Sequence, residues 1–261
     1  MRADSVPDLS ADNRVKEIEF RALRRSATLD VALLLPMDAY SLVSKLKKAV
    51  KVPIHLHTHN TTGTGDLVNL MAAYAGVDIV DGAIGPLSSL TSQPSINSLV
   101  EALRGTERDT GIDPAGLQKL SDYWSDSRER YASFDKGLRV PVTDIYRYEI
   151  PGGQYTNLQP QVEALGLGHR FDDVKEMYRT VNDMLGDIIK VTPSSKMVGD
   201  LAIFMVQNNL TPENIVQRGA ALAFPDSVVS YFKGMMGQPA WGFQPEGLQD
   251  CLLYTSPSPR D

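Results

Sequence analysis

Residues 52–60 read Val-Pro-Ile-His-Leu-His-Thr-His-Asn, and this stretch decides both the fold prediction and the first candidate site. An apolar lead-in is followed by three histidines, each separated from the next by one other residue. Side chains on a β-strand alternate between its two faces, so the three imidazoles share one face, while Leu56 and Thr58 take the other. We therefore predict a strand over residues 51–58 that carries a row of imidazoles.

Two histidines at alternate positions of a strand can bind one divalent metal ion. Neutral imidazole is a good ligand for zinc, manganese and related ions. The alternative is a polar strand end whose imidazoles are only hydrogen-bonded. Residues 61–65 are Thr, Thr, Gly, Thr and Gly, which predict a loop of small residues at the carboxyl end of the strand. α/β folds place their sites at that end of their strands, which favours the metal site.

Helices and strands alternate on either side of this strand. Helical spacing of apolar residues predicts helices over 38–50, 66–74 and 94–104, and an apolar run predicts a second strand over 77–81. Alternation at this spacing is typical of a parallel α/β sheet or barrel. Residues 1–30 show only a weak helical pattern and no strand signal.

The second half of the chain is predicted to be mostly helical. The predicted helices cover residues 113–131, 171–185, 194–209 and 226–233. Residues 188–191 form a short β-branched run and are expected to be extended. Residues 150–158, Ile-Pro-Gly-Gly-Gln-Tyr-Thr-Asn-Leu, are expected to form a conformational loop. Their glycine pair lacks the spacing of both nucleotide-binding glycine motifs, so we expect no nucleotide there.

Composition and charge exclude several classes of protein. Lys and Arg number 26 against 32 Asp and Glu, and the formal net charge of -6 argues against a protein that binds nucleic acid. No apolar run approaches the roughly 18–20 residues of a membrane span, and the first residues lack a signal-peptide pattern. A single cysteine, Cys251, excludes a disulfide framework and a cysteine-based metal site. The remaining histidine, His169, is expected in a surface loop.

Four motifs occur in the order that one known family has them. They are PIHLHTH at 53–59, TSQP at 91–94, IPGGQYTNL at 150–158, and KVTPSSKMVGD at 190–200 with FMVQN at 204–208. In these motifs the chain closely resembles the carboxyltransferase domain of the pyruvate carboxylase family, over roughly residues 33–249. Oxaloacetate decarboxylase and transcarboxylase subunits share this architecture, but the form GGQYTNL favours pyruvate carboxylase among them.

The resemblance implies an α/β fold: the C-terminal part of a TIM-type barrel followed by a mostly helical carboxylase domain. A full barrel needs about 200–250 residues, and only residues 31–105 have the barrel pattern, so we expect a fragment. Residues 31–112 are then the last strands and helices of the barrel, and 113–249 the helical conserved carboxylase domain. Residues 1–30 are unassigned, with a non-native origin as one interpretation. Residues 250–261 are expected to be a non-native tail, since they look like translated sequencing adaptor.

The resemblance also implies a divalent metal ion, manganese or zinc, held by two histidines, an aspartate and a carbamylated lysine. It assigns His57 and His59 to the histidine pair and leaves His55 as a packed or supporting group. Two residues depart from the family pattern. Asn60 stands where the family usually has aspartate, and Thr28, which cannot be carbamylated, stands where it has the lysine. The metal-binding aspartate belongs to an earlier strand that we expect this chain to lack.

A second candidate site lies at residues 192–196. By resemblance, the Thr192 hydroxyl relays a proton between the methyl group of pyruvate and biotin, a role that suits a group that both donates and accepts. Ser195 and Lys196, by resemblance, contact biotin. On the residues alone, Thr-Pro-Ser at 192–194 is better interpreted as the capping sequence of a helix, and the resemblance reverses this preference. Asp78 and Asp81, three residues apart and so on opposite faces of a strand, are expected to be structural.

The function that the resemblance implies is transfer of CO₂ from carboxybiotin to the enolate of pyruvate, forming oxaloacetate. The expected partners are pyruvate, a biotin carrier domain and further copies of the parent enzyme, in the cytoplasm or in the mitochondrial matrix of a eukaryote. One alternative is a metal-dependent lyase or aldolase of the same barrel superfamily, which also uses an HxH strand but needs no biotin site. The other is an inactive truncated chain.

Overall fold

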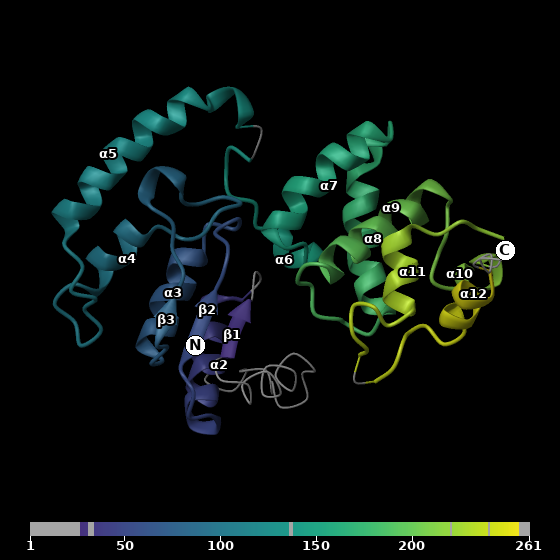
Figure 1. Ribbon diagram of the computed structural model, residues 1–261, viewed down its shortest axis with the longest axis horizontal. Coiled ribbons are helices and arrows are strands. Elements are labelled where there is room, and N and C mark those ends of the chain that lie inside the picture. The colour runs from purple at the N-terminus through teal and green to yellow at the C-terminus, as the bar shows by residue number, and fades with distance from the viewer. Residues whose placement is uncertain (1–26, 31–33, 136–137, 220, 240, 256–261) are drawn as a thin grey trace, which may run out of the picture. The chain divides into compact units, whose positions relative to one another are not determined.

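The computed structural model describes residues 27–30, 34–135, 138–219, 221–239 and 241–255 of the chain (Figure 1). The chain divides into two compact units, with the division between Thr143 and Asp144. The weak helical pattern in the first residues and the last residues of the expected tail lie outside the described part. None of the helices described is long and apolar enough to cross a membrane.

The first unit contains a three-stranded parallel sheet. Its strands β1 (Ala27–Asp30), β2 (Ile54–His57) and β3 (Ile79–Val80) lie in the order β1-β2-β3. In the register of the sheet, Thr28 lies opposite His55 on one side, and Ile79 lies opposite His55 on the other. The prediction of a parallel sheet with a histidine-bearing strand is confirmed, and β1 is a strand that the sequence pattern missed.

Helices follow each strand in the first unit, as predicted. They are α2 (Pro36–Ala49), α3 (Gly65–Tyr74), η2 (Gly85–Leu87), α4 (Ile96–Leu103), α5 (Pro114–Arg130) and η3 (Ala132–Phe134). Pro36 occupies the first turn of α2, where its missing N–H costs no hydrogen bond. The Asp113 carboxylate caps α5 by accepting hydrogen bonds from the N–H groups of Ala115 and Gly116.

The alternation predicted for β2 is confirmed by burial. Ile54 and Leu56 are both fully buried, in a core with side chains of α2 and α3 such as Leu46 and Val68. His55 and His57 lie on the other face of the strand and are partly exposed. One face of β2 therefore packs in the core of the unit, and the other face carries the histidines, which remain accessible.

Asp78, just before β3, connects the start of that strand to β2 and α2. Its carboxylate accepts a hydrogen bond from the Ile54 N–H at 2.8 Å and forms an ion pair with the Lys47 Nζ at 2.8 Å. Burial acts to raise the pKa of Asp78, but the Ile54 amide and the Lys47 ammonium outweigh it and hold the pKa below the ordinary value of 3.8. The ionised form is therefore favoured by folding.

We expect the stability difference between wild type and Asp78→Asn to depend on pH. A carboxyl whose pKa is depressed by folding stabilises the protein above its unfolded-state pKa, and that contribution disappears as pH falls through the folded-state pKa. The difference in unfolding free energy should therefore be largest near neutral pH and shrink in acid. Urea unfolding followed by Trp124 fluorescence in a Trp241→Phe background measures it. A difference that stays constant across this range would contradict the assignment.

All secondary-structure elements in the described part of the second unit are helices, joined by irregular segments. Its helices are α6 (Ile145–Tyr148), α7 (Gly152–Ala164), η4 (Gly168–Arg170), α8 (Phe171–Met184), α9 (Ser194–Gln207), α10 (Ile215–Gly219), α11 (Asp226–Phe232) and α12 (Leu248–Thr255). The helices predicted over 171–185, 194–209 and 226–233 are confirmed. The loop predicted over 150–158 is wrong, because Gly152 begins α7. Residues 188–191 are irregular rather than a strand.

Helix α9 is the centre of the second unit. It packs against α7, α8 and α11 (Figure 1), and Met197, Val198 and Leu201 are fully buried. At Gly199 a β-carbon would come within 2.4 Å of the Gln154 Nε2 of α7, so glycine permits this close approach. The second candidate site lies at the amino end of α9, so it is supported by a helix whose side chains are largely buried.

Two boundaries in the structure differ from those expected. The division between units comes after Thr143 rather than after residue 112, because α5 packs against η2 and α4. Residues 250–255, within the expected tail, continue α12, and Leu252 is buried in the core of the second unit. The non-native origin of residues 250–261 stays a prediction.

Candidate functional site

Asp81 connects two of the three histidines. Its Oδ1 lies 2.7 Å from the His55 Nε2, and its Oδ2 lies 2.7 Å from the His57 Nδ1. Burial acts to raise the pKa of Asp81, but the hydrogen bonds from His55 and His57 outweigh it and hold the pKa below its ordinary value. An ionised carboxylate only accepts hydrogen bonds, so each imidazole must donate an N–H to it.

His59 is oriented by a different acceptor. Its Nδ1 lies 2.6 Å from the backbone carbonyl oxygen of Thr91, which can only accept, so this ring also carries its proton on Nδ1. The rings of His57 and His59 meet edge to face, with centroids 5.4 Å apart. In neutral His57 and His59 the lone pair is therefore on Nε2, while Nδ1–H is held by an acceptor. Metal-binding histidines have this arrangement.

His55 differs from the other two histidines. Its Nε2 is the nitrogen that Asp81 holds, whereas in His57 and His59 the Nδ1 is held. His55 shares Asp81 with His57, so it helps to fix the carboxylate that orients His57. This contact agrees with the supporting role expected for His55.

The departure at Asn60 has a structural explanation. The Asn60 side chain is buried, donates through Nδ2 to the Asp66 carboxylate at 2.8 Å, and accepts through Oδ1 from the Gly65 N–H at 2.8 Å. An ionised aspartate could accept from Gly65 but could not donate to Asp66. At Gly65 a β-carbon would come within 2.8 Å of the His59 carbonyl oxygen. Asn60 and Gly65 together fix the loop that holds His59.

The described residues supply only part of a metal site. Among them, no group of three or more His, Cys, Asp and Glu side chains could hold a metal ion. His57 and His59 fit the donor chemistry, but zinc usually needs at least three protein ligands. In the register of the sheet, the position expected for the lysine ligand is Thr28 on β1, beside His55. The donor set is therefore incomplete among the described residues.

The second candidate site lies at the amino end of α9. Thr192 is exposed, two residues before the helix begins, and the Ser195 side chain is buried, with only 6% of its surface exposed. The Lys196 side chain is 56% exposed and forms an ion pair with Asp200 one turn along the helix. The three residues are thus close in the chain, but their side chains have different surroundings.

A cavity of about 530 Å³ lies beside α9 in the second unit. Lys196 and Asp200 line it together with the apolar side chains of Ile203 and Phe204, and residues of α7 and α11 complete the wall. Thr192 and Ser195 are not among the lining residues. Lys196 is therefore the one member of the predicted set that faces this cavity.

Two family models match consecutive parts of the chain. A model described as HMGL-like matches residues 9–123, and one described as the conserved carboxylase domain matches residues 145–260. Pyruvate carboxylase of Bacillus subtilis is 50% identical over 239 residues, which is 91% of this chain and 21% of that protein. Pyruvate carboxylase of Staphylococcus aureus is 52% identical over the same share of each chain. The chain thus spans about a fifth of these relatives.

Solved structures agree with this likeness. The carboxyl transferase domain from Rhizobium etli pyruvate carboxylase has a TM-score of 0.88 and 42% identity, over 97% of this chain and 44% of that one. The same domain with pyruvate and biocytin has a TM-score of 0.86 and 43% identity, over 93% of this chain and 42% of that one.

The HMGL-like match, the conserved carboxylase match and the carboxyl transferase structures together point to the carboxyltransferase class. The strand of imidazoles and the motif before α9 belong to the first two of these matches respectively. Over nearly its whole length this chain is similar to pyruvate carboxylases, within their carboxyltransferase region. The expected fold class, part of a TIM-type barrel followed by a helical carboxylase domain, is confirmed by these matches.

The contacts of Asp81 with His55 and His57 were not predicted from the sequence. We expected Asp81 to be structural because alternation puts it on the opposite face of the strand from Asp78. Strand β3 ends at Val80, so Asp81 lies in the following loop, where alternation no longer applies. A signal was available, because polar residues after neighbouring parallel strands meet at one edge of the sheet.

Proposed function

We propose that this chain is part of a pyruvate carboxylase and contributes to the transfer of CO₂ from carboxybiotin to the enolate of pyruvate. Relatives with this name match the chain at about half identity, and a solved relative contains pyruvate and biocytin. The observation that carries the proposal is the motif Thr192 to Lys196, at the amino end of a buried helix within the conserved carboxylase domain.

In this proposal Thr192 is the proton relay. Its exposed hydroxyl receives the proton that leaves the methyl group of pyruvate while its own proton passes to biotin, so Oγ1 accepts and donates in one exchange. Carboxybiotin, when bound, would supply the carboxyl group, and the biotin that remains would take up the proton. Ser195 and Lys196 contact biotin, and the exposed Lys196 ammonium can reach an acceptor by turning away from Asp200.

His57 and His59 are proposed as two ligands of one divalent metal ion, manganese or zinc. The Nδ1 hydrogen bonds to Asp81 and Thr91 favour this assignment, because they leave both Nε2 atoms available. The remaining ligands are not supplied by the part of the chain that the structure describes.

The lyase alternative explains less of the chain. It accounts for the HMGL-like match over residues 9–123, but it gives no role to the conserved carboxylase domain over 145–260. The remaining partners are proposed from the family: a biotin carrier domain and further copies of the parent enzyme. The proposed location is the cytoplasm, or the mitochondrial matrix in a eukaryote, and the human relative is named mitochondrial.

Replacing Thr192 by alanine in the intact carboxylase that contains this segment is expected to slow oxaloacetate formation by about 10²–10⁴-fold, the usual contribution of a general acid–base group. Carboxylation of biotin should be unchanged, since it occurs at another site. Thr211→Ala, an exposed threonine beyond the carboxyl end of α9, is the matched control and should retain activity. Full oxaloacetate formation by Thr192→Ala would remove the relay from the proposal.

A further inference from the structure

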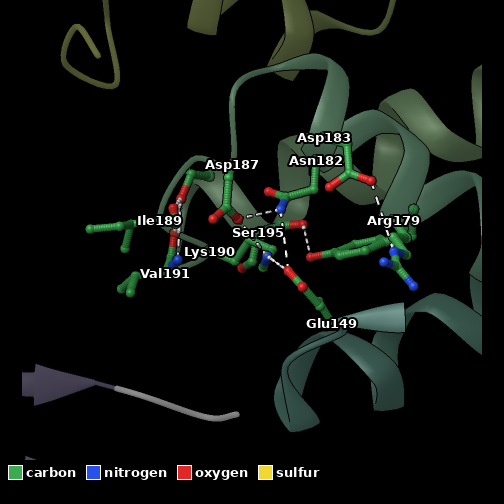
Figure 2. Close-up of polar contacts among 11 residues, drawn as sticks. Glu149, Arg179, Asn182, Asp183, Asp187, Ile189, Lys190, Val191 and Ser195 are labelled. Carbon is green, nitrogen blue, oxygen red and sulfur yellow. Dashed lines mark hydrogen bonds and ion pairs between the residues drawn. The ribbon is translucent and has the colours of Figure 1, made fainter. Parts of the chain in front are cut away.

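Lys190 is a buried lysine two residues before Thr192. Only 9% of its side chain is exposed, and its Nζ lies 2.7 Å from the Glu149 Oε2 and 3.8 Å from the Asp187 Oδ1. Figure 2 shows Lys190 between these two carboxylates. A charge removed from water to this degree is stable only when it is paired and hydrogen-bonded. The position of Lys190 is therefore fixed by its partners.

The two carboxylates come from different parts of the second unit. Glu149 follows α6 and Asp187 follows α8, and both have left-handed backbone conformations, with φ of 57° and 55°. The fully buried Asn182 of α8 joins them, since its Nδ2 donates to Asp187 at 2.7 Å and approaches Glu149 at 3.4 Å (Figure 2). Lys190 thus ties its own segment to the ends of two helices.

The segment that carries Lys190 and Thr192 has no regular structure of its own. Residues 188–193 form neither helix nor strand, so side chains must hold them in place. At the far end, the Ser194 hydroxyl lies 2.5 Å from the Ile189 carbonyl oxygen and 2.6 Å from that of Val191. The segment is therefore held at two points, by Lys190 and by Ser194.

Tyr178 stabilises the start of α9 through a hydrogen bond to its backbone. Its hydroxyl donates to the Ser195 carbonyl oxygen at 3.3 Å. Burial, and then the charge of Glu149, raise the pKa of Tyr178 above its ordinary value, so the hydroxyl remains a donor. Glu149 therefore pairs with the Lys190 ammonium and also favours the neutral form of Tyr178.

From these contacts we infer that Lys190 is a positioning residue for Thr192. Its ammonium, held by Glu149 and Asp187, fixes residues 188–192 so that the Thr192 hydroxyl is presented at the amino end of α9. Lys190 is buried and acts through the backbone, so it is not itself a catalytic residue. The inference rests on the proposed function for the role of Thr192, but the anchoring of the segment is measurable on its own.

The first test is hydrogen exchange on the full chain. Lys190→Met removes the charge but keeps an unbranched side chain, and amides of residues 188–192 should exchange at least about tenfold faster, as expected of a local opening. Amides in the middle of α9 should be unchanged. Lys175→Met is the matched control, because Lys175 is also a largely buried lysine of this unit but pairs with Asp172 rather than with Glu149 or Asp187. Unchanged exchange at 188–192 in Lys190→Met overturns the inference.

The second test uses the intact carboxylase. Lys190→Met should lower kcat at least about tenfold, with little change in the KM for pyruvate, since misplacing a reacting group affects the transition state more than binding. Lys190→Arg, which keeps the charge, should recover part of kcat. An unchanged kcat with loosened exchange also overturns the positioning role. If Thr192→Ala leaves oxaloacetate formation unchanged, the proposed function is overturned instead. The exchange result for Lys190→Met would still stand.

Glu149→Gln is a milder variant that keeps the inference testable if Lys190→Met unfolds the second unit. If Lys190→Met exposes the α9 amides to exchange, Glu149→Gln is the replacement, because it leaves the Lys190–Asp187 pair in place. Exchange at residues 188–192 should then rise while the α9 amides stay protected. Protection of 188–192 equal to wild type in Glu149→Gln contradicts the anchor.

Discussion

Replacing Leu201 by alanine is expected to lower the unfolding free energy of the second unit by about 2–5 kcal/mol, the range for truncating a buried leucine. Leu201 is fully buried in α9, which is surrounded by α7, α8 and α11. Neighbours on several helices cannot all move inward to fill the space, so a cavity remains and adds to the lost burial.

Urea unfolding can measure this loss in a Trp124→Phe background. The chain has two tryptophans, and Trp241 is the one in the second unit, packed against its core. Leu165→Ala is the matched control, because Leu165 is 51% exposed and its truncation should change stability by no more than about 0.5 kcal/mol. Equal losses in the two variants would show that α9 is not the centre of the unit's stability.

The confirmed parts of the fold are those where burial is periodic along one element. In α9 the buried residues recur at helical spacing, and in β2 they alternate, because each element rests one face on a core. These patterns are local, so the residues of the element alone reveal them. The helix at 38–50 was predicted on the same grounds, from apolar residues at helical spacing.

The wrong predictions are those where tertiary contacts override local preference. Two glycines suggested a loop at 150–158, because glycine is a poor helix former. In the structure α7 begins at Gly152 and buries Leu158 and Val162 in the core of the unit. Residues 188–191 have strand-forming side chains, but no described residue of the second unit belongs to a strand with which they could pair. Strand β1 was missed because its pairing with β2 has no local signal.

For the candidate site, the histidines were predicted from the sequence, but their hydrogen-bond partners were not. The row of three imidazoles follows from alternation and from the loop after the strand, and the family resemblance selects His57 and His59 from it. The partners that fix their rings are Asp81 and Thr91, and both lie far along the chain from the histidines. Contacts between the ends of neighbouring strands depend on the fold, so only a prediction of which loops meet could have found them.

Replacing Asp81 by asparagine is therefore expected to weaken binding of a divalent metal ion by about 10–100-fold, the usual cost of losing a group that orients a histidine ligand. Asparagine offers one acceptor oxygen and one donating amide, so it can accept from only one of His55 and His57. The ring that loses its acceptor can rotate or change tautomer. Titration of the chain with Zn²⁺, monitored by calorimetry, gives the affinity.

Asp78→Asn is the matched control for this titration, because it is the same change from aspartate to asparagine three residues away. Asp78 contacts Ile54 and Lys47 rather than the histidines. The Asp78→Asn variant should bind Zn²⁺ as wild type does, and so should His169→Gln, which changes the histidine outside the row. His57→Gln and His59→Gln should each lose more affinity than Asp81→Asn, because they remove a ligand rather than its support. Wild-type affinity in both histidine variants would remove the metal site, whereas a wild-type chain without micromolar affinity would favour the inactive-chain alternative.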